Sequence, residues 1–239
     1  MLIRTWNLFH GNTVPPGRVN LLEEAVRLAA SGDPDVVCLQ EIPVWALEYL
    51  DDWSGMVALG ATAARPLLGR ELARHVTALN PGLLRSAVTG QANAILVAPE
   101  LRVLESHSIA LNARAFRKRR VAQAVRLALP VGRTLTVGNL HATNANETIA
   151  DVELLRAAVF LDATAAPGDV AVLAGDFNLR RGRALDELAA WGFSKPGPGI
   201  DHVLVRGAEA APAAVWPKEH RRIGGLLVSD HAPVDVTIS

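Results

Sequence analysis

The sequence predicts an α+β fold in which two packed β-sheets are flanked by helices. Helical and strand patterns alternate near both ends of the chain, whereas short strand-like runs follow one another through its middle. Half of the 239 residues are hydrophobic, so the chain can bury a substantial core. Because no linker, repeat or low-complexity tract interrupts it, we expect one domain covering residues 1–239.

The N-terminal part has the pattern strand, helix, strand. Residues 2–7 predict a strand, and residues 18–30 predict a helix that ends near Gly32. The apolar residues of this helix have the spacing of one helical face: Leu22, Ala25, Val26 and Ala29. The valine-rich run "PDVVCLQE" is too short for a helix and predicts a buried strand, with Glu41 just past its end.

A second amphipathic helix is predicted over residues 66–79, after which the chain becomes rich in strands. The apolar side of this helix is expected to contain Leu68, Leu72, Val76 and Leu79. Four strand-like runs follow, separated by the Pro, Gly or charged interruptions that are typical of antiparallel neighbours: 93–98, 102–111, 121–129 and 134–140.

Helices and strands alternate again in the C-terminal part. Residues 147–164 predict a helix in which Val152, Leu155 and Val159 share an apolar face. The run "DVAVLAGDFN" predicts a strand that ends in polar residues, and residues 183–190 predict a further helix. The last two predicted strands are "IDHVLV" and "APVDVTI".

Composition restricts the partners and the compartment. The 24 basic residues balance 24 acidic ones, so no net field draws the protein to nucleic acid or an anionic membrane, and only a local basic patch is left. The single cysteine, Cys38, cannot form an internal disulfide, and its apolar run predicts burial. No secretory signal pattern begins the sequence, and no apolar run approaches the roughly 20 residues of a membrane span. We expect a soluble, cytoplasmic monomer.

Short groups of Asn, Asp, Glu and His end several of the apolar strands. These groups are Trp6-Asn7, Gln40-Glu41, "NLHATN" and "GDFN". Each alone fits a plain loop, because Asn and Asp compete for backbone hydrogen bonds and favour turns. Together they also suit a hard divalent cation such as magnesium, which takes oxygen ligands from one or two carboxylates, water and phosphate. Glu41 is the first candidate ligand, with Asn7 or Asp230 beside it.

The same groups suit attack by water on a phosphoester. That reaction needs a group that orients and deprotonates the water, donors for the phosphate oxygens, and help for the departing oxygen. The side chains with these functions are His141, Asp176, Asn178 and His231. Spacing in the sequence alone does not bring them together.

Six ordered motifs resemble those of the endonuclease/exonuclease/phosphatase superfamily. They are "TWNLFHGN", "VVCLQE", "NLHATN", "GDFNL", "IDHVLV" and "SDHAPV", and they extend from Asn7 to His231, which is almost the whole chain. The superfamily includes pancreatic deoxyribonuclease, abasic-site endonucleases, neutral sphingomyelinases and inositol polyphosphate phosphatases. The resemblance implies a four-layer α/β/β/α sandwich of two mixed, largely antiparallel β-sheets.

The resemblance also implies a metal site. Asn7 and Glu41 match the positions that lie at the metal in the family, and Asp230 of "SDH" matches a residue near it. The implied cofactor is Mg²⁺, with Mn²⁺ or Ca²⁺ as alternatives.

The catalytic residues implied by the resemblance lie in the other motifs. Asp176 and Asn178 match residues that activate the attacking water and hold the phosphate, and His231 matches a histidine that contacts the scissile phosphate. Asp201 matches the partner of that histidine and would favour its charged form. His141 matches a histidine of pancreatic deoxyribonuclease and sphingomyelinases, where abasic-site endonucleases typically have a tyrosine. This difference argues against abasic-site repair.

Other residues are candidates for substrate binding or for packing. Asn144 matches a phosphate-contacting residue of some relatives, and a purely structural role in its loop fits as well. The cluster "RAFRKRR" offers Arg117 and Arg119 to a phosphate backbone, although a solvated edge between strands explains it equally well. His202 takes a place often held by an aromatic residue in the family and is expected to pack or to line the site, without a catalytic role. The segment 60–90 is expected to influence substrate choice.

The leading functional hypothesis is a magnesium-dependent phosphodiesterase, most simply a nuclease. The first alternative is a phosphatase, or a phosphodiesterase of a phospholipid, sphingomyelin or small metabolite. The second is an inactive member that binds nucleic acid or protein. The presence of all eight motif residues argues against the inactive alternative: Asn7, Glu41, His141, Asp176, Asn178, Asp201, Asp230 and His231.

Overall fold

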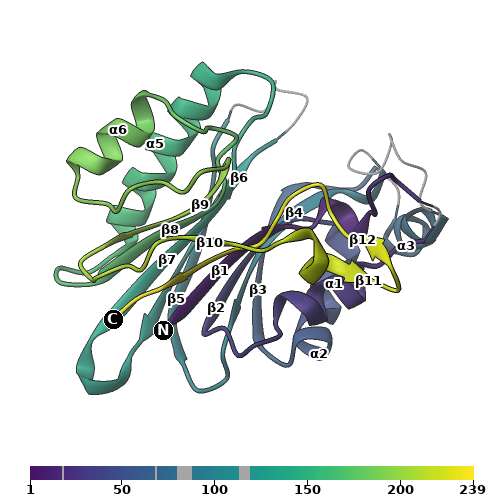
Figure 1. The fold of residues 1–239 in the computed structure, drawn as a ribbon, viewed down its shortest axis with the longest axis horizontal. Helices are drawn as coiled ribbons and strands as arrows, with labels where there is room; N and C mark the ends of the chain where they lie inside the picture. The colour runs from purple at the N-terminus through teal and green to yellow at the C-terminus, as the bar shows by residue number, and fades with distance from the viewer. Residues whose placement is uncertain (18, 68, 80–87, 113–118) are drawn as a thin grey trace.

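Two β-sheets packed face to face form the centre of the protein (Figure 1). The computed structural model describes residues 1–239 except 18, 68, 80–87 and 113–118. The larger sheet has six strands in the order β10-β13-β1-β2-β4-β3, and the other has five in the order β5-β6-β7-β8-β9. A separate pair, β11-β12, precedes the last strand.

The secondary-structure elements have the following bounds. The strands are β1 Leu2–Asn7, β2 Val36–Ile42, β3 Val57–Ala64, β4 Gln91–Val97, β5 Arg102–Ala110, β6 Val121–Ala128, β7 Thr134–His141, β8 Val170–Asp176, β9 Asp201–Arg206, β10 Ala214–Val215, β11 Arg222–Ile223, β12 Leu226–Leu227 and β13 Val234–Thr237. The α-helices are α1 Leu22–Ala29, α2 Leu50–Ser54, α3 Arg70–Leu79, α5 Glu147–Thr164 and α6 Arg183–Ala190. The short 3-10 helices are η1 Phe9–Gly11, η2 Val44–Tyr49, η4 Pro130–Gly132 and η5 Lys218–Arg221.

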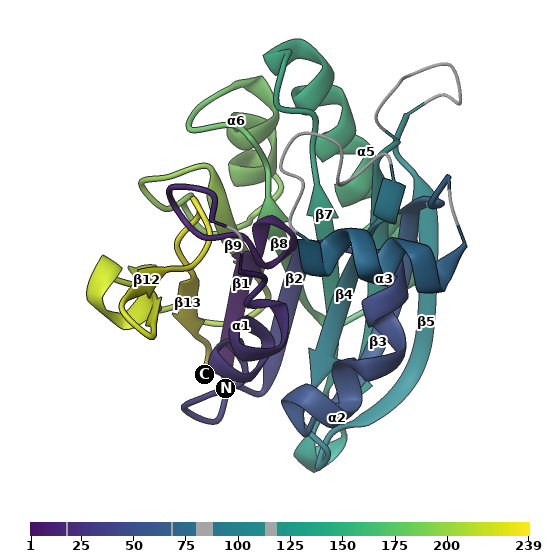
Figure 2. The same ribbon diagram turned by 90° about the vertical axis from the view of Figure 1, so that its right-hand side faces the viewer.

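The predicted sandwich of mixed, largely antiparallel sheets is confirmed. Only β1 with β2 and β7 with β8 pair in parallel among the described strands, and the other ladders are antiparallel. Helices α5 and α6 cover the outer face of the five-stranded sheet, whereas α1, α2 and α3 cover the six-stranded sheet (Figures 1 and 2). No helix among the described residues is long and apolar enough to cross a lipid bilayer.

The interface between the two sheets is apolar and rich in β-branched side chains. Ile3, Val36 and Ile95 of one sheet meet Val137 and Val172 of the other, and all five are nearly or fully buried. Such side chains pack well on a pleated surface and hold the sheets rigidly together. Cys38 lies in this layer as predicted, where burial raises the pKa of its thiol and keeps it inert.

The predicted apolar face of α5 is wrong, although the predicted bounds of the helix are confirmed. Val152 and Val159 are 60% and 58% exposed, and Leu155 is only partly buried. The buried side instead consists largely of small residues, with one glutamate: Ala150, Glu153, Leu154, Ala157, Ala158 and Leu161. Alanines allow the helix to lie close to the sheet, Leu154 and Leu161 fill the core beside them, and the two valines face solvent.

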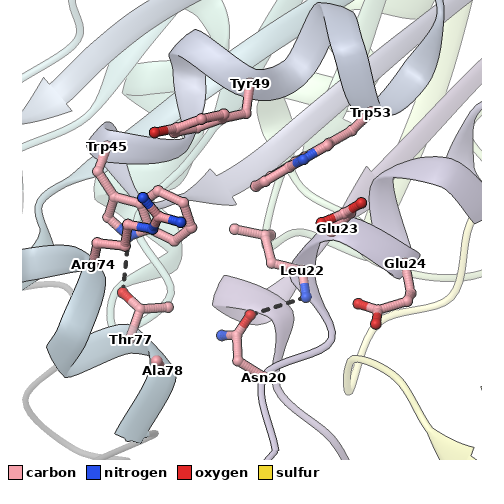
Figure 3. Close-up of a pocket in the computed structure, with 10 residues that line it drawn as sticks. All are labelled: Asn20, Leu22, Glu23, Glu24, Trp45, Tyr49, Trp53, Arg74, Thr77 and Ala78. Carbon is pink, nitrogen blue, oxygen red and sulfur yellow. Dashed lines mark hydrogen bonds between the residues drawn. The ribbon is translucent and has the colours of Figure 1, made fainter.

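The segment between residues 57 and 79 also differs from its prediction. Residues 57–64 form strand β3 at the edge of the six-stranded sheet, which the sequence did not indicate. The helix begins at Arg70, four residues later than predicted, and Leu72 is 51% exposed while Ala73 and Thr77 are buried. Helix α3 therefore packs through small and polar residues, and a pocket lined by aromatic side chains lies beside it (Figure 3).

Candidate active site

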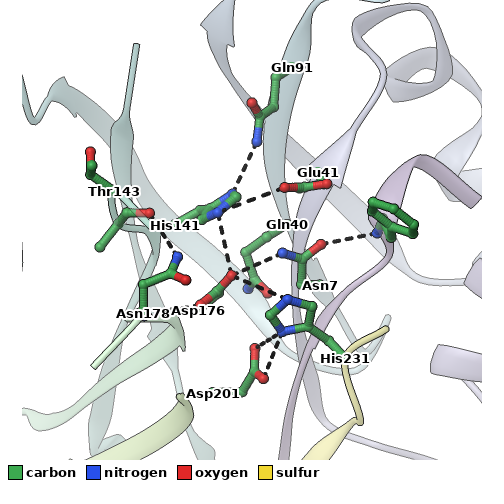
Figure 4. A network of polar contacts seen from close by, with 12 residues as sticks. Asn7, Gln40, Glu41, Gln91, His141, Thr143, Asp176, Asn178, Asp201 and His231 are labelled. Carbon is green, nitrogen blue, oxygen red and sulfur yellow. Dashed lines mark hydrogen bonds and ion pairs between the residues drawn. The ribbon is translucent and has the colours of Figure 1, made fainter. Parts of the chain in front are cut away.

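Polar side chains converge where strands of both sheets end. Asn7 is opposite Gln40 in the parallel pair β1-β2, and His141 is opposite Asp176 in the parallel pair β7-β8. Asp176 is also opposite Asp201, the first residue of the antiparallel strand β9. Parallel pairing in each sheet therefore brings the strand-ending residues to one edge of the sandwich (Figure 4).

Asp176 lies at the centre of this cluster and is almost fully buried. Its Oδ2 accepts a hydrogen bond from Asn7 Nδ2 at 3.0 Å, and its Oδ1 accepts one from the Asn178 backbone N–H at 3.0 Å. Burial, together with the nearby charge of Asp201, raises the pKa of Asp176 to about 7, against the lowering influence of His231 and these hydrogen bonds. A carboxyl group with such a pKa can exchange a proton near neutral pH.

His231 and Asp201 form the hydrogen-bonded pair expected from the motifs. His231 Nδ1 lies 2.8 Å and 3.0 Å from the two carboxylate oxygens of Asp201, although the residues are 30 positions apart. Burial acts against the charged imidazole, but the hydrogen bond and charge of Asp201, with Asp176 and Asp230, raise the pKa of His231 to about 9. The other nitrogen, Nε2, lies 3.8 Å from Asp176 Oδ2, so a charged imidazolium faces the central carboxyl group.

His141 is oriented by a residue that the sequence did not reveal. Its Nδ1 accepts a hydrogen bond from Gln91 Nε2 at 3.0 Å, which leaves the proton on Nε2. That Nε2 lies 3.3 Å from Asp176 Oδ2 and 3.8 Å from Glu41 Oε1. His141 is 3% exposed and presents an N–H toward the space between the two carboxyl groups.

Glu41 and Asp230 offer the oxygen ligands of a candidate metal site. The Glu41 side chain is 21% exposed, and both imidazole nitrogens near it, on His10 and His141, lie beyond hydrogen-bond distance at 3.7 Å and 3.8 Å. Burial is the main cause that raises the pKa of Asp230, and Glu41 contributes to this shift. A carboxyl group whose ionisation is opposed by a neighbouring carboxylate suits a divalent cation, which would remove that cost.

Asn7 fits this candidate metal site less directly. Its Oδ1 accepts a hydrogen bond from the Phe9 backbone N–H at 3.0 Å, while its Nδ2 donates to Asp176. One lone pair of Oδ1 is left for an ion. The amide therefore links the Asp176 carboxylate to the start of η1.

A second group with metal-ligand geometry consists of Asp176, Asp201 and His231, whose candidate ligand atoms all lie within 4.8 Å of one another. The direct hydrogen bond between His231 and Asp201 already accounts for much of this closeness. A hard cation prefers oxygen ligands, so Glu41 with Asp230 suits Mg²⁺ better than a set that contains an imidazole engaged by its own carboxylate.

Several site residues have an unusual backbone conformation. Glu41, Asn178 and Ser229 have φ values of 55°, 53° and 60°, a region that non-glycine residues seldom adopt. Glu41 lies in the irregular part of the β2-β4 ladder between Leu39 and Ile42. Gly175 has φ 141°, and a Cβ there would lie 2.0 Å from the Leu140 carbonyl oxygen. Only glycine therefore allows Asp176 to follow in register with His141. Such local strain is typical of functional sites.

Arg120 is the charged residue that the sequence analysis overlooked. It is 3% exposed, and among the described residues its Nε has no hydrogen-bond partner. Burial lowers the pKa of its guanidinium, and the charges of Glu41, Glu153 and Asp176 act in the opposite direction, so it lies within electrostatic reach of the cluster. The basic run around it was the available signal, but its pattern did not show which arginine points inward.

The remaining predicted residues lie at different distances from the cluster. Asn178 belongs to the cluster through its backbone N–H, which donates to Asp176 Oδ1. Its side-chain Nδ2 donates to the Ala142 carbonyl oxygen at 2.9 Å. Asn144 and Arg119 are exposed, and no contact in the described part of the chain ties them to the cluster. Arg117 lies outside the described residues. His202 is fully buried beneath the ring of Phe177 and packs as predicted.

The sequence matches a family model over nearly its whole length. The model is that of the endonuclease/exonuclease/phosphatase family, and the match covers residues 5–231. The chain belongs to this family. Members of the endonuclease/exonuclease/phosphatase family are hydrolytic phosphoesterases. Among curated proteins, none matches the chain.

Solved structures share the fold at low sequence identity. A conserved protein of unknown function from Enterococcus faecalis has a TM-score of 0.76 at 16% identity, with 100% of this chain and 99% of the other covered. A mannosyl-6-phosphatase from Bacteroides thetaiotaomicron has a TM-score of 0.73 at 14% identity, with coverage of 100% and 99%. The catalytic domain of human Nocturnin with a bound sulfate anion has a TM-score of 0.67 at 17% identity, with coverage of 100% and 93%.

Proposed function

We propose that this member of the endonuclease/exonuclease/phosphatase family is a magnesium-dependent phosphodiesterase that acts as a nuclease. The observation that carries the proposal is the buried Asp176 carboxyl group, which is faced by the imidazole of His141 at the end of β7 and by that of His231 in the segment before β13. One imidazole is made cationic by Asp201, and the other presents an N–H. Water activation, charge stabilisation and leaving-group protonation each have a suitable side chain.

The proposed roles follow from the proton positions. Asp176 accepts the proton of the attacking water while Asn7 and Asn178 hold its carboxylate in place. The His231 imidazolium, held by Asp201, and the Arg120 guanidinium stabilise the charge that develops on the phosphate oxygens. His141 Nε2–H donates to the departing oxygen, because Gln91 keeps the proton on that nitrogen. A metal ion held by Glu41 and Asp230, with Asn7 beside them, would supply Lewis-acid stabilisation of the same phosphate.

A substrate screen tests this function. Purified protein is incubated with Mg²⁺ and single- or double-stranded DNA, RNA, sphingomyelin, phosphoinositides, sugar phosphates and bis-(nitrophenyl) phosphate. We expect cleavage of nucleic acid or the model diester, and no cleavage by Asp176→Ala. The matched control is Asp186→Ala in α6, which is outside the cluster. Full diesterase activity in Asp176→Ala, after contaminants have been removed, would disprove the assignment.

The metal has a separate test in direct binding. Calorimetric titration with Mg²⁺ or Mn²⁺ should show one or more sites in the wild type and a loss of roughly tenfold or more in affinity in Glu41→Gln. Exhaustive chelation should stop turnover, and added Mg²⁺ should restore it. Unchanged metal affinity in Glu41→Gln would remove Glu41 from the metal site even if the enzyme stays metal-dependent.

A phosphomonoesterase is the second candidate. It is favoured by the similarity of the fold to the mannosyl-6-phosphatase, which covers both chains almost completely. The buried cationic Arg120, which lies within electrostatic reach of Glu41 and Asp176, would also suit the additional negative charge of a terminal phosphate. Release of inorganic phosphate from sugar phosphates, without cleavage of any diester in the same screen, would favour this candidate over the nuclease.

A further inference from the structure

A pocket of about 410 Å³ lies in the helical layer over the six-stranded sheet, and none of its lining residues belongs to the polar cluster described above. Three aromatic side chains spaced four residues apart form one wall: Trp45, Tyr49 and Trp53 (Figure 3). Tyr49 stacks on Trp53 with ring centroids 5.5 Å apart, and Trp45 meets both rings edge-on at 6.0 Å. Trp53 and Tyr49 remain partly exposed, so their surfaces can receive a ligand.

Several of the polar groups that line this aromatic pocket are already hydrogen-bonded within the protein. Trp45 Nε1 donates to Thr77 Oγ1 at 2.9 Å, and that hydroxyl donates in turn to the Ala73 carbonyl oxygen. Asn20 Nδ2 donates to the His10 carbonyl oxygen, and Asn20 Oδ1 accepts from the Leu22 backbone N–H. The side chains of Trp45, Thr77 and Asn20 are therefore already paired, so a primary ammonium with three N–H groups would find fewer acceptors at the aromatic wall than in water.

Acidic residues outnumber basic ones among the charged residues that line the pocket, which are Glu23, Glu24 and Arg74. Glu23 and Glu24 line it, and residues 42–64 contain three acidic residues but no lysine, arginine or histidine. Glu23 pairs with Arg27 at 2.8 Å, whereas Glu24 is exposed and pairs with no cation in the described part of the chain. An unpaired carboxylate beside aromatic faces favours a positively charged ligand.

The chain itself places one cation against this wall. The Arg74 guanidinium lies over the Tyr49 ring, 5.6 Å from its centroid, and Arg74 is exposed. This contact is a cation–π interaction that an incoming ligand can replace, since the arginine is free to move into solvent.

We propose that the aromatic pocket binds an organic cation that carries a quaternary methylammonium group. Such a group has a diffuse charge, an apolar surface and no N–H groups that need acceptors, which matches the aromatic faces, the paired side chains of Trp45 and Asn20, and the nearby Glu24 carboxylate. The proposal is independent of the phosphodiesterase assignment, and its test measures binding without any reaction.

The test follows the tryptophan indole signals in ¹H–¹⁵N spectra of the full-length protein during a titration with choline. The chain has five tryptophans, and substitution of each assigns its indole signal. Choline should shift the indole signals of Trp45 and Trp53 and leave those of Trp6, Trp191 and Trp216 in place. The neutral carbon isostere 3,3-dimethyl-1-butanol, at the same concentrations and constant ionic strength, should shift them much less.

Three substitutions separate the contributions to binding. Trp53→Leu keeps an apolar side chain but removes the ring, and should weaken choline binding about tenfold. Glu24→Gln should weaken it about threefold, while Glu100→Gln, an exposed control elsewhere, should not change it. Arg74→Gln removes the internal competitor and should strengthen it about twofold or more.

Two outcomes would overturn the proposal. In one, the neutral isostere shifts the same signals with equal affinity, which would mean a purely apolar pocket. In the other, choline shifts neither Trp45 nor Trp53. If Trp53→Leu does not fold, Glu24→Gln still decides, because it changes only one exposed side chain, and unchanged choline affinity in that variant would remove the charge argument.

Discussion

An aspartate with a buried side chain lies at each end of strand β8, and the environments of these two side chains are opposite. Asp169 comes directly before the strand and Asp176 ends it. Four donors surround the Asp169 carboxylate: the hydroxyls of Thr134 and Thr136, the Ala166 backbone N–H and Arg126. Burial acts to raise the pKa of Asp169, but these hydrogen bonds outweigh it and lower the pKa to about 2.

Asp176 receives two hydrogen bonds, and the pKa of its carboxyl group is raised to about 7, chiefly by burial. Hydrogen-bond donors therefore stabilise the Asp169 carboxylate fully at one end of the strand, whereas the Asp176 carboxylate at the other end is only partly stabilised. The free energy of holding Asp176 in this state must come from elsewhere in the fold, including the apolar interface that the middle of the same strand helps to form. The start of strand β8 is therefore built for stability and its end for chemistry.

The largest expected effect comes from removing the charge at the functional end. Asp176→Asn should lower turnover by about 10³-fold or more, because the amide cannot accept the proton of water. The same change should raise the free energy of unfolding of the metal-free protein at about pH 8 by roughly 1 kcal/mol, because a buried, poorly satisfied charge is removed. Steady-state kinetics and thermal denaturation measure the two effects. A variant that loses both activity and stability would contradict this account of Asp176.

The His231–Asp201 pair should have the next largest effect. His231→Gln and Asp201→Asn should each lower turnover by about 10²-fold, and the double variant should be little worse than either, because the two residues act as a unit. A pKa of about 9 means that His231 is protonated at neutral pH and that activity requiring the imidazolium falls as the pH rises through about 9. In Asp201→Asn this fall should move to lower pH. Additive losses in the double variant, or an unmoved basic limb, would show that the hydrogen bond has no part in catalysis.

Arg120 and its neighbour Arg119 allow a matched comparison of a buried and an exposed cation. Arg120→Gln should lower kcat/KM by about 10-fold to 100-fold, because a charge-assisted contact to phosphate is lost. Arg119→Gln, which changes an exposed residue next to it, should have almost no effect at moderate ionic strength. Circular dichroism checks that the Arg120 variant is folded. Equal losses in the two variants would point to a diffuse basic surface and away from a single buried contact.

Much of the fold was predictable from local patterns, and the errors have local causes. Strands β1, β2 and β8 are apolar runs that end in polar residues, and helix α6 has the predicted bounds. Strand β3 was missed because its sequence, VALGATAA, consists largely of small residues and lies at a sheet edge with little burial. The buried face of α5 was misassigned because close packing selects alanine, which hydrophobic periodicity weighs less than valine.

The sequence identifies the site residues that stand at recognisable positions along the chain. It does not identify those whose role depends on a contact with a distant residue. Asp176 ends the apolar strand β8, and Glu41 follows the apolar run of β2 although the strand continues to Ile42; both positions are visible in the sequence. Gln91 is identified only by its contact with His141, 50 positions away. Arg120 stands in a run of basic residues that looks uniform, and only the fold turns it inward while Arg119 stays exposed. Contacts between distant residues determine the roles of Gln91 and Arg120, and hydrophobic periodicity carries no information about such contacts.

The smallest effect on turnover should come from the stabilising end of strand β8. Asp169→Asn removes a carboxylate whose side chain is 1% exposed, and leaves Arg126 and two threonine hydroxyls without their ionised acceptor. We expect the free energy of unfolding at neutral pH to fall by about 2 kcal/mol, with turnover per folded molecule unchanged.

Because the pKa of Asp169 lies below the roughly 3.9 of an unfolded chain, its contribution to stability is complete above about pH 4 and is lost as the pH falls through about 2. Urea denaturation between neutral pH and about pH 2 should therefore show a shallower acid-induced loss of stability in Asp169→Asn than in the wild type. If Asp169→Asn lowered turnover as strongly as Asp176→Asn, the two ends of the strand would not be separable into stability and chemistry.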